Sequence, residues 1–186
     1  MPDFQHIIRS FALANEVTEP QAVKVGFIND SFILPSKVPY GTSYFLQRIN
    51  HHIFENVEGL QQNIQLVTDH IRKKLLAQGE TDVERKVLRL VPTKDGKRYY
   101  QTPEGDYWRV YVFIENATSK DSVTPESAEL AGEAFGNFQC QLADLPFDAL
   151  CESIPNFHNI EFRLWQFHEA LKADKAGRVS SCKDLI

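Results

Sequence analysis

Residues 23–49 read VKVGFINDSFILPSKVPYGTSYFLQRI, and this stretch decides the fold. Apolar residues over 23–28 predict a strand, Asn29 and Asp30 form a turn signal, and residues 31–34 resume the strand pattern, as in a tight hairpin. After a loop over 35–41, residues 43–49 predict a third strand. The stretch therefore predicts the first half of an antiparallel sheet.

A long amphipathic helix is predicted directly after this sheet segment, over 57–76. Strands are predicted over 87–91, 98–101 and 108–114, and a short helix over 4–13. The helix is indicated by apolar residues at steps of three and four, namely Val57, Leu60, Ile64, Val67, Ile71 and Leu75. Together these elements predict an α+β fold, in which one helix interrupts an antiparallel sheet.

The last third of the chain has a helical pattern. A polar stretch over 117–123 predicts a boundary between a first domain, 1–116, and a helical part, 117–186. One helix is expected after Thr124 and Pro125, since proline is favoured in the first helical turn. The two apolar stripes are Ala131, Phe135, Phe138 and Leu142, and then Ile160, Leu164, Phe167 and Leu171.

Composition excludes several classes of protein. The 186 residues carry a net charge of −5, which argues against a general nucleic-acid binder. No apolar run is long enough to span a membrane, and the N-terminus lacks the features of a signal peptide. Three widely spaced cysteines, Cys140, Cys151 and Cys182, indicate free thiols in the cytoplasm.

Self-sufficient catalytic motifs are absent from the sequence, which has no P-loop and no nucleophile elbow. His51 and His52 have no further ligand at zinc spacing, so we predict no metal site. What remains is an order of parts: a hairpin, a strand whose pattern predicts that the cation Arg48 is buried, a long helix and an apolar strand. That order is typical of a kinase N-terminal lobe, although Arg48 alone is better explained by a structural salt bridge or a solvated cation at the sheet edge.

Several blocks of the sequence, from about residue 23 to 178, resemble the aminoglycoside phosphotransferase and choline kinase superfamily, in its N-acetylhexosamine 1-kinase branch. The blocks are residues 26–32 (GFINDSF), 44–50 (YFLQRIN), 53–60 (IFENVEGL), 63–64 (NI), 108–114 (WRVYVFI) and 154–158 (IPNFH).

The resemblance implies an ATP-dependent kinase that phosphorylates the anomeric hydroxyl of a sugar such as N-acetylglucosamine or N-acetylgalactosamine. Arg48 matches the cation for the ATP phosphates, and the helix over 57–76 braces it through Glu58, Gln62 or Asn63. His158 is expected near the sugar, although a helix-cap histidine explains it equally. The phosphate-covering loop matches Gly26, Phe27, Ile28, Asn29, Asp30 and Ser31, and the adenine-binding hinge matches Phe113, Ile114, Glu115 and Asn116.

The catalytic machinery of that family is not found in the sequence. No histidine is followed two places later by aspartate, and no Asp-x-Asp occurs. We therefore assign no catalytic residue and no metal ligand, and we expect the ligands of Mg²⁺ only in a missing C-terminal part. The chain is predicted to be a fragment without turnover, comprising a kinase-like N-terminal lobe and the first helices of a C-terminal lobe. It is expected to self-associate through exposed apolar residues, namely Phe135, Phe138, Phe157, Trp165 and Phe167.

Two other functions stay open. A kinase-like lobe without a catalytic loop fits a non-catalytic module that binds a nucleotide or a protein. A mucin-desulfating sulfatase, the label that some relatives carry, is disfavoured because none of the three cysteines lies in a Cys/Ser-x-Pro-x-Arg motif.

Overall fold

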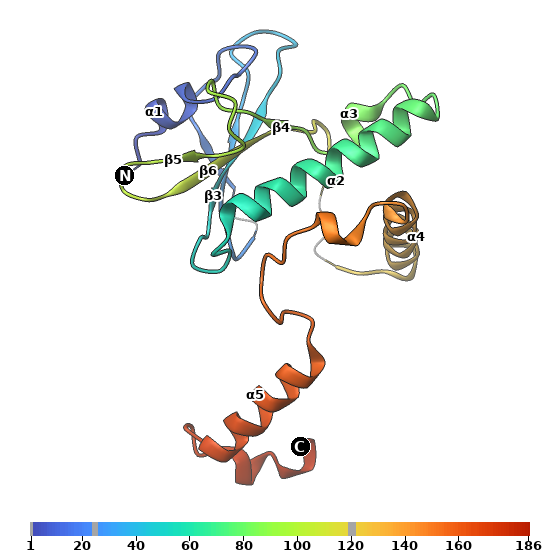
Figure 1. Cartoon of the computed structure of the whole chain (residues 1–186). Helices are drawn as coiled ribbons and strands as arrows, with labels where there is room; N and C mark the ends of the chain where they lie inside the picture. Colours follow the sequence, from blue (N-terminus) through green and yellow to red (C-terminus); the bar gives the residue numbers. More distant parts are fainter. Residues whose placement is uncertain (1, 24–25, 119–121) are drawn as a thin grey trace. The chain divides into compact units, whose positions relative to one another are not determined.

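The structure is a computed structural model that describes residues 2–23, 26–118 and 122–186 (Figure 1). Its contacts divide the chain into two compact units, Met1–Ser153 and Ile154–Ile186, each of which is described by itself. The predicted boundary at 116/117 falls inside the first unit, and residues 119–121 lie outside the described residues. The functional division at that point stays a prediction.

The described residues of the first unit form a six-stranded antiparallel sheet. Its strand order is β1-β2-β3-β6-β4, and β5 also pairs with β6. The α+β class and the antiparallel sheet are therefore confirmed. The strands are β1 (Gln21–Val23), β2 (Asp30–Leu34), β3 (Tyr44–Ile49), β4 (Leu90–Val91), β5 (Tyr100–Gln101) and β6 (Tyr107–Val112).

One face of the sheet carries the main core and is covered by α1 (Phe4–Arg9). Successive side chains of a strand point to opposite faces, so residues two apart share a face. Leu46 and Trp108 are fully buried on this face, where Ile7 and Phe11 pack against them. Ser10 caps the predicted N-terminal helix, which therefore ends at Arg9.

The opposite face is the side of α2 (Val57–Ala77), which the sequence predicted almost to the residue (Figure 1). Asn56 caps this helix by accepting a hydrogen bond from the amide of Gly59. Near its start, Glu58 hydrogen-bonds the hydroxyl of Tyr99, whose pKa is raised by burial and by this carboxylate. Tyr99 contacts Tyr107 on the same face, so α1 and α2 lie on opposite sides of the sheet.

Two predicted strands differ most in their extent from the observed ones. The strand over 23–28 ends at Val23: Phe27 to Asn29 form bends, Gly26 has a φ of +116°, and Lys24 and Val25 lie outside the described residues. The strand over 87–91 shortens to β4 because Val87 packs against α2. A short helix that the sequence did not reveal, α3 (Val83–Lys86), precedes it. Four residues are too few to show a helical period.

The helix α4 (Pro125–Leu142) begins directly after Thr124, as its sequence predicted. The structure adds a capping box formed by Thr124 and Ser127, which the sequence analysis did not predict. Its C-terminal end is tied to α2 by a cluster that we call the Asp144 clasp. Oδ1 of Asp144 lies 2.7 Å from Nζ of Lys74 and 3.0 Å from Nε2 of His70. Nζ of Lys74 also donates to the carbonyl of Gln141, at 2.9 Å. The clasp therefore fixes α4 to α2 through one carboxylate.

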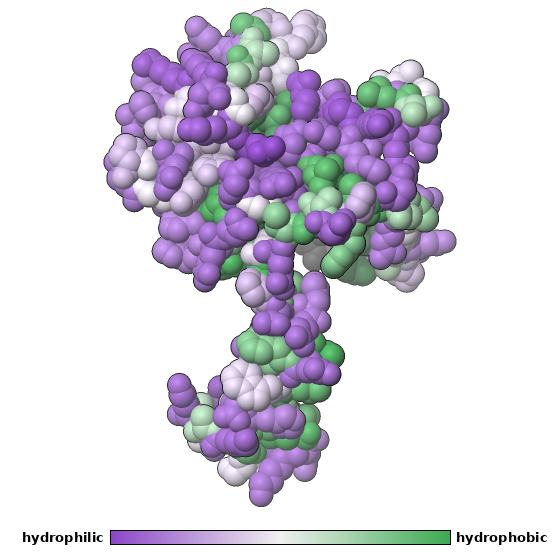
Figure 2. All heavy atoms as spheres, viewed as in Figure 1, coloured by the Kyte–Doolittle hydropathy of each residue, from purple (hydrophilic) through white to green (hydrophobic). Residues whose placement is uncertain are grey.

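The second unit contains α5 (Ile160–Ala173), whose N-cap is Asn159. Short 3-10 turns follow at Val179–Ser181 and Lys183–Leu185, and another, at Phe147–Ala149, belongs to the first unit. Figure 2 shows apolar side chains at the surface of this unit. The residues predicted to be exposed are exposed in both units, namely Phe135, Phe138, Phe157, Trp165 and Phe167. The self-association expected from them stays a prediction.

Among the helices of the described residues, none is both long and apolar enough to cross a membrane.

The Asp144 clasp should make stability depend on acid pH. Lys74 and then His70 lower the pKa of Asp144 from its ordinary value to about 2. A carboxylate whose pKa is lower in the folded than in the unfolded chain stabilises the fold at pH values above its ordinary pKa of about 4. This stabilisation is lost as the pH falls from there toward the lowered pKa of the folded chain. We therefore expect Asp144→Asn to lower the urea midpoint at pH 6, and to differ less from wild type between about pH 4 and pH 2. Asp148→Asn, in the adjacent turn, is the control, and equal effects of the two variants at every pH would contradict the clasp.

Candidate functional site

The predicted site residues meet where the loop before β2 reaches the end of β3. A cavity of about 230 Å³ opens there. Three predicted residues, Ile28, Asp30 and Arg48, line it together with Ile49, Asn50, His51, His52 and Asp106. These three residues therefore lie at one cavity, together with Asn50 and Asp106, to which the sequence assigned no role. Their part in binding a nucleotide stays a prediction.

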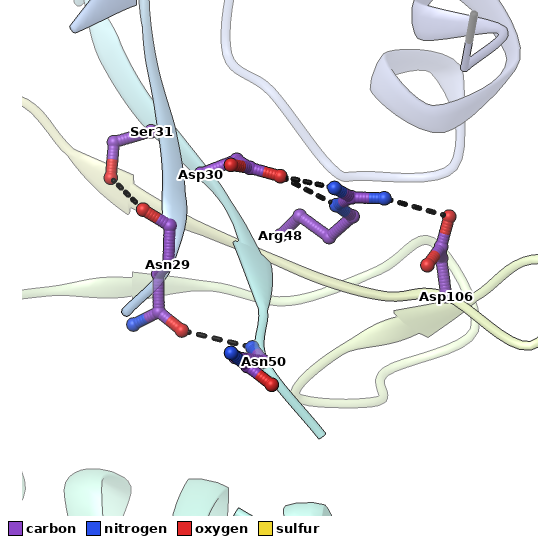
Figure 3. Close-up of polar contacts among 6 residues, drawn as sticks. All are labelled: Asn29, Asp30, Ser31, Arg48, Asn50 and Asp106. Carbon is purple, nitrogen blue, oxygen red and sulfur yellow. Dashed lines mark hydrogen bonds and ion pairs between the residues drawn. The ribbon is translucent and has the colours of Figure 1, made fainter. Parts of the chain in front are cut away.

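Arg48 is held by two carboxylates (Figure 3). Its Nε donates to Oδ2 of Asp30 at 2.8 Å, its Nη2 makes a second, short contact to the same oxygen, and its Nη1 lies 3.5 Å from Oδ2 of Asp106. Asp30 and Arg48 are direct partners across β2 and β3. The hydrogen bonds that Arg48 donates to Asp30 raise the pKa of Arg48. Asp30 and Asp106 therefore compete with any anion that approaches this guanidinium.

The predicted burial and bracing of Arg48 are wrong. Its side chain is 42% exposed, and its row, Asp30–Arg48–Trp108, is on the α1 face of the sheet, opposite α2. Two of the α2 residues predicted to brace Arg48 contact other groups. Glu58 pairs with Arg98, and the side-chain amide of Asn63 makes two hydrogen bonds with the backbone of Cys151. The pleat of β3 explains the error, since an apolar-flanked cation can belong to either face of a strand.

Asn29 does not form the predicted tight turn. Its side chain instead fixes the loop to the end of β3. Oδ1 of Asn29 accepts a hydrogen bond from the amide of Asn50 at 2.9 Å (Figure 3). The Ser31 hydroxyl accepts from Nε2 of Gln47 at 3.0 Å and donates weakly, at 3.5 Å, to the carbonyl of Asn29. Phe27 is fully exposed at the surface of the loop. The base of the loop is thus fixed by β3, while its apolar tip is open to solvent.

The α2 face of the sheet carries a buried cation that sequence reasoning missed. Arg109 is 8% exposed, and its Nε and Nη2 both donate to Oε1 of Gln47, at 3.1 and 2.9 Å. Its guanidinium carbon lies 5.2 Å from the centre of the Tyr111 ring. Burial lowers the pKa of Arg109, and Nη1 has no hydrogen-bond partner among the described residues. An arginine inside an otherwise apolar strand was the signal in the sequence.

The predicted hinge follows β6 directly, and part of its backbone is already engaged. The amide of Phe113 donates to the carbonyl of Ser43 at 3.0 Å, and the carbonyl of Glu115 accepts from Nη1 of Arg85 at 2.8 Å. Within the described residues, the carbonyl of Phe113 and the amide of Glu115 have no hydrogen bond. The Phe113 ring stacks on that of Phe45, with 6.4 Å between centroids. A carbonyl and an amide two residues apart can pair with the donor and acceptor on the edge of a base.

The structure places His51 and His52 in the first unit and His158 in the second. Over 2–23, 26–118 and 122–186, no group of three or more His, Cys, Asp or Glu side chains could hold a metal ion. The rings of His51 and His52 contact each other at 4.3 Å, and His51 also contacts Tyr107. His158 lies in the second unit, exposed in the turn before α5 and against the ring of Phe157. Its predicted place near a sugar stays a prediction.

No family model matches the chain. Among solved structures, it is similar to a microcompartment-associated aminopropanol kinase, with a TM-score of 0.44 and 12% identity over 70% of this chain and 37% of that one. It is also similar to spectinomycin phosphotransferase APH(9)-Ia, in complex with ADP and spectinomycin, with a TM-score of 0.44 and 14% identity over 80% and 40% of the two chains. The chain thus spans about two fifths of the length of these structures. Because both TM-scores are below 0.5, the proposals below rest on the residues of this chain.

The two faces of β3 should respond differently to mutation. Gln47→Ala removes the acceptor of a buried guanidinium, so we expect a loss of about 2–4 kcal/mol in the free energy of unfolding. Asp30→Ala breaks a pair whose side chains are 42% and 54% exposed, so we expect a loss below about 1 kcal/mol. Urea denaturation measures both losses. Equal losses would show that Gln47 and Asp30 hold their arginines equally strongly.

Proposed function

We propose that this chain provides the nucleotide-binding part of an ATP-dependent phosphotransferase of the aminoglycoside phosphotransferase type, acting in the cytoplasm. The proposed acceptor is a sugar hydroxyl, as in an N-acetylhexosamine 1-kinase, with N-acetylglucosamine or N-acetylgalactosamine as substrate. Gly26 to Ser31 cover the phosphates, Phe113 to Glu115 hold adenine, and His158 contributes to the sugar pocket. Arg48 is the predicted phosphate cation.

The register of the central strands carries this proposal. Asp30, at the end of the loop, pairs with Arg48 near one end of β3, whereas Val112, just before the hinge, pairs with Tyr44 at the other end. Four residues of strand separate these rows, which is about 13 Å. Such a span suits an extended nucleotide with its base at the hinge and its phosphates at the loop.

The chemistry of the two ends agrees with that orientation. At the hinge, the carbonyl of Phe113 can accept from the amino group of adenine, and the amide of Glu115 can donate to a ring nitrogen. At the loop, Arg48 can bind phosphate oxygens in competition with Asp30 and Asp106. Bound Mg²⁺ neutralises phosphate charge in phosphoryl transfer, but the described residues form no cluster of ligands for it.

A non-catalytic module that binds a nucleotide is the second candidate. The specific observation in its favour is the sequence, in which no histidine is followed two places later by aspartate. Both candidates require nucleotide binding, and only the first requires that a longer gene product phosphorylate a sugar. Sequencing the gene downstream of Ile186 separates them, because a His-x-Asp loop there would favour the kinase.

Nucleotide binding should raise the melting temperature of the 186-residue chain. Ligands that bind only the native state stabilise it by mass action, so even weak binding shows at millimolar ATP or ADP, with or without Mg²⁺. We expect Arg48→Ala to reduce the shift. Arg98→Ala is the matched control, because its side chain is also 42% exposed and also pairs with a carboxylate. Equal shifts in both variants would remove Arg48 from the site, and no shift in wild type would contradict nucleotide binding by this chain.

The 186-residue chain alone should show no kinase turnover. Phosphoryl transfer depends on a base that positions the hydroxyl and on metal-held phosphates, and the described residues supply neither. We expect release of ADP in the presence of N-acetylglucosamine to stay at the level of a reaction without protein. Detection of a sugar phosphate by mass spectrometry would contradict the assignment of the chain as an inactive part.

A further inference from the structure

Arg109 is a buried cation that has no counter-charge among the residues that the structure describes. Within 2–23, 26–118 and 122–186, its hydrogen bonds go only to the neutral amide of Gln47, and Nη1 is buried without a partner. The Tyr111 ring beside it offers a weak cation–π contact. A buried charge is costly unless an opposite charge accompanies it. The unliganded chain therefore contains a buried guanidinium whose positive charge a bound anion would neutralise.

The neighbouring row of the sheet shows the contrast. Arg48 follows Gln47 in β3 and points to the other face, where Asp30 and Asp106 already neutralise it. The more exposed arginine thus has two carboxylates, and the buried one has none among the described residues. For a phosphate, Arg109 is the cation for which no carboxylate of the described residues competes.

The position of Arg109 lies between the two ends of the proposed nucleotide site. Its row in the sheet is Ser31–Gln47–Arg109, and Ser31 is the last residue of the predicted phosphate loop. The next row on the same face is Ile33–Phe45–Tyr111, and Phe45 stacks on Phe113 of the hinge. The guanidinium is therefore on the α2 face, between the loop and the hinge.

We propose that Arg109 is the cation for a phosphate group of the nucleotide on the α2 face of the sheet, and that Gln47 is the latch that holds its guanidinium until that phosphate replaces it. This inference rests on the proposed function. A phosphate offers several charged oxygens to the planar fork of arginine, whereas Gln47 offers one neutral oxygen to two of its nitrogens. Because Nη1 is buried, the guanidinium must turn away from Gln47 to bind.

The test supplies the missing counter-charge from within the protein. Gln47→Glu places a carboxylate where the amide oxygen now accepts from Arg109, so we expect the unliganded protein to melt at a higher temperature. We also expect this variant to bind ATP at least tenfold more weakly, because its carboxylate occupies the guanidinium and repels phosphate. Gln101→Glu makes the same change of charge at an exposed position of β5 and is the control.

A second variant removes both the charge and the latch. The double variant Gln47→Met, Arg109→Met replaces the pair by apolar side chains of similar length, a change that buried ionic groups often tolerate. We expect it to fold and to lose the same affinity for ATP. Isothermal titration with ATP, adenosine and inorganic tripolyphosphate measures binding for all the variants.

The outcomes separate this inference from the proposed function. If the Gln47→Glu variant melts lower than wild type, or if it and the double variant bind ATP as wild type does, Arg109 is not the phosphate cation, and nucleotide binding stands without it. If tripolyphosphate binds and Gln47→Glu abolishes its binding, while ATP and adenosine do not bind, the anion site stands and the proposed nucleotide function falls. If none of the three ligands binds the wild type, both are overturned.

Discussion

The pleat of β3 is the constraint on which the rest of the structure depends. It sends Gln47 and Arg48, adjacent in sequence, to opposite faces of one sheet. On one face, Leu46 lies in the core that α1 covers. Arg48 lies two residues further along β3 on the same face, where it reaches the solvent. On the other face, Gln47 meets the buried Arg109. A shift of β3 by one residue would exchange these environments and bury Arg48 on the face away from Asp30.

The two faces handle charge in different ways because they differ in access to water. Where solvent reaches Arg48, carboxylates and water share the guanidinium, and each ion pair contributes little to stability. Where α2 lies over the sheet, Arg109 is shielded, and each missing partner costs more. The unbalanced charge is thus on the face where an ordered ligand would be held most firmly. This is why the arrangement favours a binding site over a purely structural pair.

The helix α2 links this sheet to the helical part of the first unit. Its start contacts Tyr99 through Glu58, its middle holds the backbone of Cys151 through Asn63, and its last turns join α4 through the Asp144 clasp. Changes at the sheet face and changes at α4 therefore act on the same helix.

The sequence by itself determined the elements whose patterns are local. Periodicity and end signals, which neighbouring residues carry, predict the helix α2, the start of α4 after Thr124 and Pro125, and most of the strands β3 and β6. Only the tertiary structure decided which carboxylates Arg48 meets, that Arg109 is the buried cation, and that Arg85 of the short helix α3 binds the hinge carbonyl of Glu115. Those facts depend on which strand lies beside which and on what covers each face. Residues 62 apart in the chain, such as Gln47 and Arg109, become partners only when the sheet closes, and no local pattern encodes that contact.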